Sequence, residues 1–505
     1  MPAVDKAAGR SAAPALRVQA FWLIVARALG FVFTLALPIL MVRVFDKVQF
    51  GAYKQAFILI GTAQALLPLG FGVTAFYFLA REPGRRPAVI LNIVLYHAAI
   101  SLLAFLTFLV WPGIVTLILG SDKLAYLAPV IGAIICLAVF SSFLEMVATA
   151  NADVAWSTSF IIGAQLSRTV LLLVAAASFR TVEAVLYASM IQAALQSITL
   201  VWYLQSRFPF FWRHFDADLA RDQVKYAAPF GLAGLLFTVQ SDLHNYLVAH
   251  EFTTAEYALY AVGTSQLPFI GILRESVSSV LLSRYSRLQQ ENRTAEILDL
   301  MLRSWRKLAA VIFPALAALM VLGPDFITVL YRKDYLASWP IFRMNLFLLL
   351  LSVFITDAVI RTYAQYRYVF MGFRFVSLVF QIVVSLLVIP VTGMIGALIG
   401  MMAAYLLERA LSMRVVLRVL GFRLQDVKQL SGVAAFALAS AAAAGVTFFT
   451  LAMMHLSSSY ARLAGGGAVF TLVYFGIVVF FGLLDGEERD LINRYSVRFL
   501  RRQIV

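Results

Sequence analysis

The sequence carries little charge, a single cysteine and few histidines. Of its 505 residues only 13% are Asp, Glu, Lys or Arg, whereas soluble domains carry about 25%. Cys136 is the only cysteine and cannot form a disulfide within the chain. The five histidines are scattered, and neither an HExxH motif nor a phosphate-binding GxxxxGK[ST] loop occurs. These gaps exclude a large soluble core and ATP hydrolysis by a P-loop, and no metal or cofactor is expected.

Long apolar runs recur along the whole chain instead. Hydrophobic residues make up 62% of the sequence, and the mean hydropathy is +0.87. A helix that crosses a bilayer needs about 20 mostly apolar residues. The sequence therefore predicts an all-α integral membrane protein with about 14 transmembrane helices. These predicted spans lie at residues 20–42, 54–79, 88–110, 125–147, 156–178, 183–204, 224–248, 256–283, 306–330, 341–363, 369–389, 393–415, 430–454 and 466–484.

Basic residues are distributed unevenly between the two sides that these spans define. Of the 41 Lys and Arg residues, 28 lie in segments on the side of the N-terminus, eight in loops on the other side and five within spans. Because Lys and Arg accumulate in cytoplasmic loops, both termini are predicted to be cytoplasmic. The same bias accounts for the net charge of +15 without nucleic acid as a partner. The outer loops are short and leave no room for an external catalytic domain.

One aromatic pattern occurs twice. Residues 45–53 (FDKVQFGAY) and 252–260 (FTTAEYALY) carry aromatic side chains at the same spacing, 207 residues apart. Each stretch joins the first and second spans of a candidate six-span half, and such halves would repeat in parallel about an axis along the membrane normal. The sequence thus predicts a six-helix lobe at 1–222 and a second at 223–429. Residues 430–505 would add two transmembrane helices and a basic cytoplasmic tail.

Two parts of the chain resemble the polysaccharide flippases of the multidrug/oligosaccharidyl-lipid/polysaccharide exporter superfamily. The first is PALRVQAFWLIVARALGFVFTLALPILMVRVFDKVQFGAYKQAFILIG (14–61). The second is YALYAVGTSQLPFIGILRESVSSVLLSRYSRL (257–288), followed by a basic linker and GPDFITVLYRKDYLASWPIFR (323–343). The resemblance covers essentially the whole chain. It implies two six-helix lobes around a central cavity, and the outward movement of undecaprenyl-diphosphate-linked sugars across the bacterial inner membrane.

Five arginines lie within predicted spans, where a mid-membrane position costs roughly 2.5–3.5 kcal/mol. Arg27, Arg274 and Arg168 belong to the first, eighth and fifth spans. At 1.5 Å per residue they lie roughly 10, 14 and 18 Å from the cytoplasmic ends of their helices. A planar guanidinium group offers paired donors to phosphate oxygens. We therefore expect these three arginines to line a cationic cavity that binds the diphosphate of a lipid-linked sugar.

Other interpretations of these arginines stay open. Arg27 could extend its head group to the inner interface, and Arg168 or Arg274 could pair with a carboxylate on a neighbouring helix. Adjacent residues on a helix point about 100° apart, so Arg274 and Glu275 do not pair well with each other. One of these two side chains is expected to face the cavity and the other to contact a neighbouring helix or linker.

Carboxylates within the spans have two expected roles. Asp242, in VQSDLHNYLVAH, and Glu275 are the candidates for binding a coupling ion, H⁺ or Na⁺. Asp242 could alternatively satisfy an arginine across the cavity. Asp357 and Arg361 are four residues apart, which predicts an intrahelical ion pair. The adjacent residues 408 and 409 (Glu and Arg), close to a helix end, are interpreted as structural or interfacial.

These features predict a transporter rather than an enzyme, one that flips a lipid-linked oligosaccharide by alternating access. Its setting would be polysaccharide biosynthesis, with lipopolysaccharide or exopolysaccharide as the product, membrane lipids around it and a polysaccharide polymerase machinery as a partner. Three rivals remain: a peptidoglycan lipid precursor flippase, a drug/cation antiporter of the same superfamily, and a membrane glycosyltransferase or polymerase. Deep arginines argue against the antiporter, and short outer loops argue against the transferase.

Overall fold

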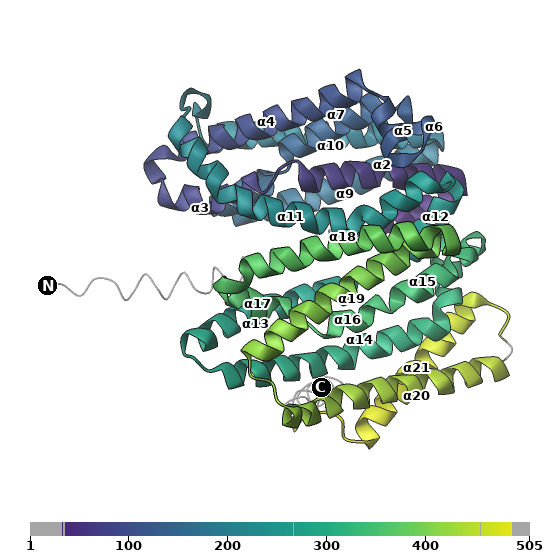
Figure 1. The fold of residues 1–505 in the computed structure, drawn as a ribbon. Helices are drawn as coiled ribbons and strands as arrows, with labels where there is room; N and C mark the ends of the chain where they lie inside the picture. The colour runs from purple at the N-terminus through teal and green to yellow at the C-terminus, as the bar shows by residue number, and fades with distance from the viewer. Residues whose placement is uncertain (1–32, 34–35, 266, 455, 487–505) are drawn as a thin grey trace, which may run out of the picture. The chain divides into compact units, whose positions relative to one another are not determined.

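The computed structural model describes residues 33, 36–265, 267–454 and 456–486, and all regular elements in these residues are helices (Figure 1). The chain divides into two compact units. Unit 1 comprises Met1–Ala261 and Leu378–Met401, and unit 2 comprises Val262–Ser377 and Met402–Val505. The prediction of an all-α, multi-pass membrane protein is confirmed.

Unit 1 is a bundle of long helices. Within it α4, α7 and α10 lie side by side, α9 packs on α10, and α11 packs on α2 (Figure 1). Its elements are α2 (Lys47–Leu66), α3 (Thr74–Arg81), α4 (Arg86–Val110), α5 (Gly113–Leu119), α6 (Asp122–Ala125), α7 (Ala128–Ser141), α8 (Leu144–Ala150), α9 (Val154–Phe179), α10 (Val182–Arg207), α11 (Ala217–Glu251), most of α12 (Thr254–Gly263), and the portions of α18 (Arg367–Thr392) and α19 (Met394–Val419) between residues 378 and 401.

The second predicted span is broken rather than continuous. Helix α2 and residues Phe71–Arg81 form a pair bent by 46°, and the connection contains Pro68 and Gly70. Gly70 has φ +69°, in the left-handed region that glycine adopts without strain. Gly231 of α11 lies against this break, where a Cβ atom would come within 2.3 Å of the Leu69 carbonyl oxygen. The absence of a side chain at position 231 therefore lets α11 approach the bent span closely.

Loops that the charge pattern assigns to the same side of the membrane contact one another in unit 1. At the predicted outer end, the Gln49 side chain donates a hydrogen bond of 2.8 Å to the Arg180 carbonyl. At the predicted cytoplasmic end, Arg85 forms an ion pair with Asp216 in the connector that precedes α11. There the Leu219 amide and the Arg85 guanidinium lower the pKa of Asp216 below its ordinary value. The grouping of these loops fits the predicted alternation of spans.

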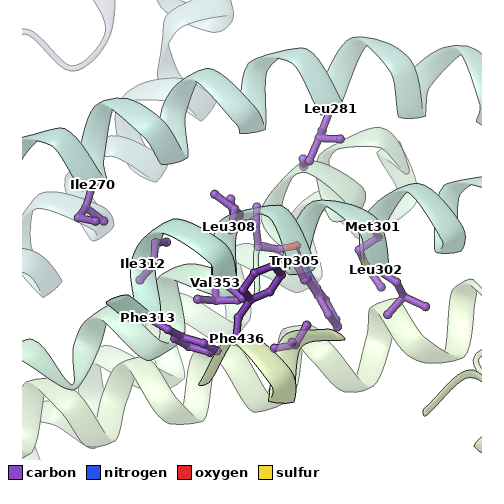
Figure 2. Packing of buried hydrophobic residues seen from close by; sticks show 14 of the residues in the cluster. Ile270, Leu281, Met301, Leu302, Trp305, Leu308, Ile312, Phe313, Val353 and Phe436 are labelled. Atoms are coloured by element: carbon purple, nitrogen blue, oxygen red, sulfur yellow. Dashed lines mark hydrogen bonds between the residues drawn. The ribbon is translucent and has the colours of Figure 1, made fainter. Parts of the chain in front are cut away.

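Unit 2 is built around the long helix α14. Trp305, Leu308 and Ile312 of α14 lie in a buried apolar cluster that also contains Val353 and Phe436 (Figure 2). The elements of unit 2 are α13 (Pro268–Gln290), α14 (Thr294–Tyr331), α15 (Trp339–Leu346), α16 (Leu348–Val353), α17 (Asp357–Thr362), the remaining parts of α18 and α19, α20 (Ser431–Met453) and α21 (Ser459–Phe480). The predicted basic linker at 284–307 is largely helical, since α13 and α14 are separated only by residues 291–293.

Two ion pairs link α14 to α21 and the segment that follows it. Arg306 pairs with Asp485, which follows α21, and the buried Asp325 accepts a 3.0 Å hydrogen bond from Arg462 of α21. Arg306 and Asp325 are 19 residues apart on α14, or about 28 Å along the helix. This separation approaches the ~30 Å thickness of the hydrocarbon core of a bilayer. The two pairs are therefore spaced to lie near opposite faces of the membrane.

Ten helices in the described residues are long and apolar enough to cross a membrane, or eleven if the bent pair counts as one span. They correspond to predicted spans 2–6 and 9–14. The seventh and eighth predicted spans fall on α11 and on α12 with α13, which are helical but do not meet the hydropathy and charge requirement. Most of the first span, at 20–42, lies outside the described residues. The figure of about 14 transmembrane helices stays a prediction.

The two copies of the aromatic pattern begin their helices in the same way. At α2, Asp46 and Gln49 form a reciprocal capping box, in which each side chain bonds the other residue's backbone. At α12, Thr253 and Glu256 form the same reciprocal arrangement. Both residues of the second box lie 207 residues after those of the first. The shared spacing of these caps supports the predicted repeat, whose lobe boundaries stay a prediction.

Candidate functional site

The predicted site residues are distributed over both units. Arg168 and Asp242 lie in unit 1, on α9 and α11, and Arg274 and Glu275 lie in unit 2, on α13. Arg27 lies outside the described residues. A common cavity lined by the three arginines therefore stays a prediction, and each residue is described in its own unit.

Arg168 has an aromatic rather than an acidic neighbour. Its guanidinium carbon lies 5.7 Å from the ring centroid of Phe57 on α2, a cation–π geometry. The Phe57 ring in turn lies 4.7 Å from the ring of Tyr53. Among the described residues, no carboxylate lies within ion-pairing distance of Arg168. In the described part of the chain, Arg168 therefore has a cation–π contact and no ion pair.

Asp242 on α11 is hydrogen-bonded to α2, and the neighbouring His244 is hydrogen-bonded to α12. The Thr62 hydroxyl of α2 donates a hydrogen bond of 2.7 Å to the Asp242 carboxylate. On α11, the buried His244 lies 2.8 Å through its Nδ1 from the Tyr260 hydroxyl, and Asn245 lies 3.3 Å from its Nε2. Sequence reasoning placed His244 and Asn245 near Asp242 but missed Thr62, which is 180 residues away and is one hydroxyl within an apolar run.

Arg274 lies on a face of α13 that is buried on both sides of it. Ile270, Leu281 and Tyr285 are separated from Arg274 by 4, 7 and 11 residues, spacings that share one helix face. These three side chains are 4%, 6% and 1% exposed and belong to the apolar cluster of unit 2. Figure 2 shows Ile270 and Leu281 at separate points along this helix. They lie 11 residues apart, or about 16 Å along the helix axis.

Between these two contact points, Arg274 itself is exposed. On the face of α13 that packs at Ile270 and Leu281, the cationic side chain of Arg274 is therefore exposed, and Val277 on the same face is partly buried. Among the described residues, neither Arg274 nor Glu275 makes an ion pair. Glu275 is exposed as well, and the expectation that one of these two side chains contacts a neighbouring helix or linker stays a prediction.

The predicted intrahelical ion pair between Asp357 and Arg361 in unit 2 is wrong. Asp357 lies 3.5 Å from Arg409 of α19 and not in a pair with Arg361, whose side chain is exposed. The Arg409 guanidinium also donates a 2.7 Å hydrogen bond to the hydroxyl of Thr356, which is fully buried. An intrahelical pair contributes only about 0.2–0.5 kcal/mol, so an arginine from a second helix that bonds both residues displaces it.

The same cluster fixes a break in the span predicted at 341–363. Residues 354–356 separate α16 from α17, and the carbonyl of Ile355 accepts a 3.1 Å hydrogen bond from the Trp305 indole. Non-helical backbone at membrane depth requires such partners, since lipid supplies none. Beside it, Arg374 and Glu408 are 3.3 Å apart and largely buried. Arg409 and Glu408 are thus both in ion pairs, as expected of structural residues.

No set of three or more metal-ligating side chains gathers in the part of the chain that the structure describes. The residues described here are cationic and carboxylate groups in three helices of predicted spans: Arg168 on α9 and Arg274 on α13 are donors suited to an anion, and Asp242 on α11 is an acceptor suited to a cation. Such groups bind and release charged ligands, and no nucleophile with an adjacent base accompanies them in the clusters described above.

Comparison with known proteins gives a family and a fold. Residues 40–340 match the model of a family described as polysaccharide biosynthesis protein. The chain is similar to the structure of a lipid II flippase, MurJ, in an inward closed conformation, with a TM-score of 0.67 and 14% identity over 94% of this chain and 99% of that one. No curated protein sequence matches the chain.

Transporters of the multidrug/oligosaccharidyl-lipid/polysaccharide (MOP) superfamily are also similar. An inward-facing multidrug resistance transporter of the MATE family matches with a TM-score of 0.63 and 14% identity, over 79% of this chain and 98% of that one. A superfamily member from Pyrococcus furiosus, described as having a binding pocket of reverse polarity, matches with a TM-score of 0.55 and 14% identity, over 80% and 95%. The chain has the MOP transporter fold.

Proposed function

This chain belongs to the family of polysaccharide biosynthesis proteins, and we propose that it moves an undecaprenyl-diphosphate-linked oligosaccharide across a bacterial inner membrane. The oligosaccharide would be the repeat unit of a lipopolysaccharide or an exopolysaccharide. The head group enters a cationic cavity from the cytoplasm while the polyprenyl tail stays in lipid. Closure of the inner side and opening of the outer side then release it, without covalent chemistry.

The observation that carries this proposal is the exposed, unpaired guanidinium of Arg274. An arginine within a membrane span is costly, and a structural arginine would have a carboxylate partner. Arg274 lies in a predicted span, has no such partner among the described residues, and is exposed between the buried positions Ile270 and Leu281 of the same helix face. A lipid diphosphate supplies the missing anion, and its oxygens suit the paired donors of a guanidinium group. Arg168, which also lacks a carboxylate partner, and Arg27 would be its second and third ligands.

Rival functions differ mainly in the charge of the substrate. The fold is common to flippases and drug transporters, so it does not choose between them. A drug/cation antiporter needs carboxylates at the substrate. Among the described residues, Glu275 is without an ion pair, as are Arg168 and Arg274, so the case for an anionic substrate rests on the two arginines. A peptidoglycan lipid precursor shares the undecaprenyl-diphosphate group and would bind the same arginines. The family match to polysaccharide biosynthesis favours the oligosaccharide over this second substrate.

Coupling to an ion would use the carboxylates. Asp242 is half-buried and accepts a hydrogen bond from Thr62, an environment in which a proton or Na⁺ can replace the hydroxyl donor. Glu275, adjacent to Arg274, would respond to the arrival of the diphosphate. The rest of the proposed organisation follows the sequence: about 14 spans, lobes at 1–222 and 223–429, both termini cytoplasmic, and a polymerase machinery that receives the product.

Reconstituted protein tests the substrate directly. Liposomes with and without the protein would carry one of three fluorescent probes in parallel: an undecaprenyl-diphosphate oligosaccharide, a lipid II analogue or a cationic dye. A membrane-impermeant quencher reports the probe that crosses to the outer leaflet or, for the dye, its uptake. We expect fast crossing of the oligosaccharide alone. Transport of the dye alone, or a new covalent sugar product made by this chain, would contradict the proposal.

A further inference from the structure

The corner between α11 and α12, residues 249–254, is held by direct backbone contacts. At Gly51 of α2, a Cβ atom would lie 2.0 Å from the Thr254 carbonyl oxygen. At Gly120, which follows α5, a Cβ atom would lie 2.4 Å from the His250 carbonyl oxygen. No side chain can occupy such a space, so the corner lies in a socket that two glycines leave open.

Hydrogen bonds continue this contact along α2 and α11. Gln55 donates 3.1 Å to the Ala249 carbonyl, the Tyr246 hydroxyl donates 3.5 Å to the Ile58 carbonyl, and Thr62 donates to Asp242. From one bond to the next, the residue number rises by three or four on α2 and falls by three or four on α11. This pattern is the one expected of two helices that pack antiparallel. From Gly51 to Thr62 the seam is about 16 Å long at 1.5 Å per residue.

The position of this seam links the two predicted lobes. Helix α2 and Gly120 belong to the predicted lobe 1–222, whereas the corner and the part of α11 from residue 223 onward belong to the predicted lobe 223–429. Gly51 lies in the first copy of the aromatic pattern and Thr254 in the second, so the two copies meet here. The charge pattern places this end of both helices outside.

We propose that docking of the 249–254 corner onto Gly51 and Gly120 is the outer closure of the transporter. The inference rests on the proposed function, because alternating access requires an outer seam that opens. In the docked state the Gln55 and Thr62 bonds hold the lobes together and the outer end is sealed. Release of the sugar outward requires the corner to leave its socket, which breaks these contacts first.

Gly51→Ala tests the socket, with Gly61→Ala as its matched control. Both glycines are on α2, but nothing lies within 4 Å of a Cβ at Gly61. The background would be Cys136→Ser with Ala249→Cys, because Ala249 is 1% exposed when docked. We expect Gly51→Ala to raise labelling of that cysteine by a membrane-impermeant maleimide several-fold and to slow crossing of the fluorescent lipid-linked oligosaccharide. Gly61→Ala should change neither.

A cross-link tests the same closure without adding volume to the socket. Gln55→Cys with Ala249→Cys, in the Cys136→Ser background, would be oxidised to join the seam. The control pair, Gln192→Cys with Ala164→Cys, joins α9 and α10 inside one predicted lobe, where Gln192 donates 3.4 Å to the Ala164 carbonyl. We expect oxidation to stop crossing in the seam pair alone and a reductant to restore it.

The outcomes separate this proposal from the proposed function. If the reduced proteins flip the oligosaccharide, the function holds whatever the seam does. Unchanged crossing in the fully cross-linked seam pair would overturn the closure, as would Gly51→Ala protein that labels and transports like Gly61→Ala. If none of the reduced proteins moves the oligosaccharide, the proposed function fails first.

Discussion

The Thr62 hydroxyl lies 2.7 Å from the Asp242 carboxylate and joins two helices 180 residues apart in the sequence. A donor to an ionised carboxylate contributes more than a neutral hydrogen bond. Asp242 is thereby both the candidate for ion coupling and the acceptor of the bond that ties α11 to α2. An ion that binds Asp242 would compete with the Thr62 hydrogen bond, so ion binding would weaken the contact between α2 and α11.

Substitution of Thr62 should expose this double role. Thr62→Val keeps the shape of the side chain but removes the donor, so we expect a loss of about 1 kcal/mol of stability and a weaker dependence of transport on the ion gradient. Thr62→Ser retains the hydroxyl and should behave like the parent. Thermal unfolding in detergent and crossing rates with and without an imposed gradient measure the two effects. Equal thermal stability and equal gradient dependence in the valine and serine variants would mean that the Thr62 hydroxyl contributes to neither property.

The partner of Asp357 can be identified by comparing two arginines. Arg409 bonds both Asp357 and the buried Thr356, whereas Arg361 is exposed and makes no ion pair among the described residues. Loss of one partner of a buried pair costs about 3–5 kcal/mol, less here because Asp357 is partly exposed. We expect Arg409→Gln to lower the amount of folded protein in the membrane and Arg361→Gln to leave it unchanged. If Arg361→Gln instead lowered the amount of folded protein more than Arg409→Gln, Arg361 rather than Arg409 would be the partner of Asp357.

The ion pair between Asp325 of α14 and Arg462 of α21 can be tested by exchanging the two charges. Asp325 is buried and bonds Arg462, so Asp325→Arg alone should strongly reduce folded protein. The double variant Asp325→Arg with Arg462→Asp restores opposite charges and should recover part of the loss. Abundance of the monodisperse protein after extraction measures both. No recovery in the double variant would mean that the pair contributes little beyond the packing of the helices.

Topology can be tested by labelling from the two sides. Arg293 lies between α13 and α14, and Ser458 precedes α21, and both are exposed. In the Cys136→Ser background, a cysteine at Arg293 should react with an impermeant maleimide only after the cells are opened. A cysteine at Ser458 should react in intact cells, because the positive-inside bias places it outside. Labelling of both from the outside would contradict the predicted orientation.

Apolar periodicity and length were enough to predict most of the spans, because a bilayer demands a long run of apolar residues. The breaks within predicted spans were not predicted, among them the one between α12 and α13 in the span at 256–283 and the two described above. Of those two, the first has a visible signal, Pro68 and Gly70 within one run, which the hydropathy pattern alone conceals. The second, at residues 354–356, contains neither residue type. It is fixed by Trp305 and Arg409, which are distant in the sequence.

The candidate site was predictable only in part for the same reason. A charged residue within an apolar run is visible in the sequence, so Arg168, Asp242 and Arg274 could be singled out. Their partners are set by tertiary contacts, which is why Thr62 was missed and why Asp357 was paired with the wrong arginine. The exposure of Arg274 between buried positions of α13 depends on which helices pack against it, and the sequence does not show those contacts directly.

The central claim is that Arg274 binds the lipid diphosphate, and one comparison of crossing rate with protein abundance tests it most directly. We expect Arg274→Ala to slow crossing on the order of 10- to 100-fold, since a bond to a charged group contributes about 1.5–3 kcal/mol, and Arg274→Glu to abolish it. Arg274→Lys keeps the charge without the paired donors and should retain part of the rate. Arg284→Ala, an exposed arginine of the same helix, is the control. All four proteins should be equally abundant; if Arg274→Ala and Arg274→Glu flip the oligosaccharide at the parent rate, the claim is wrong.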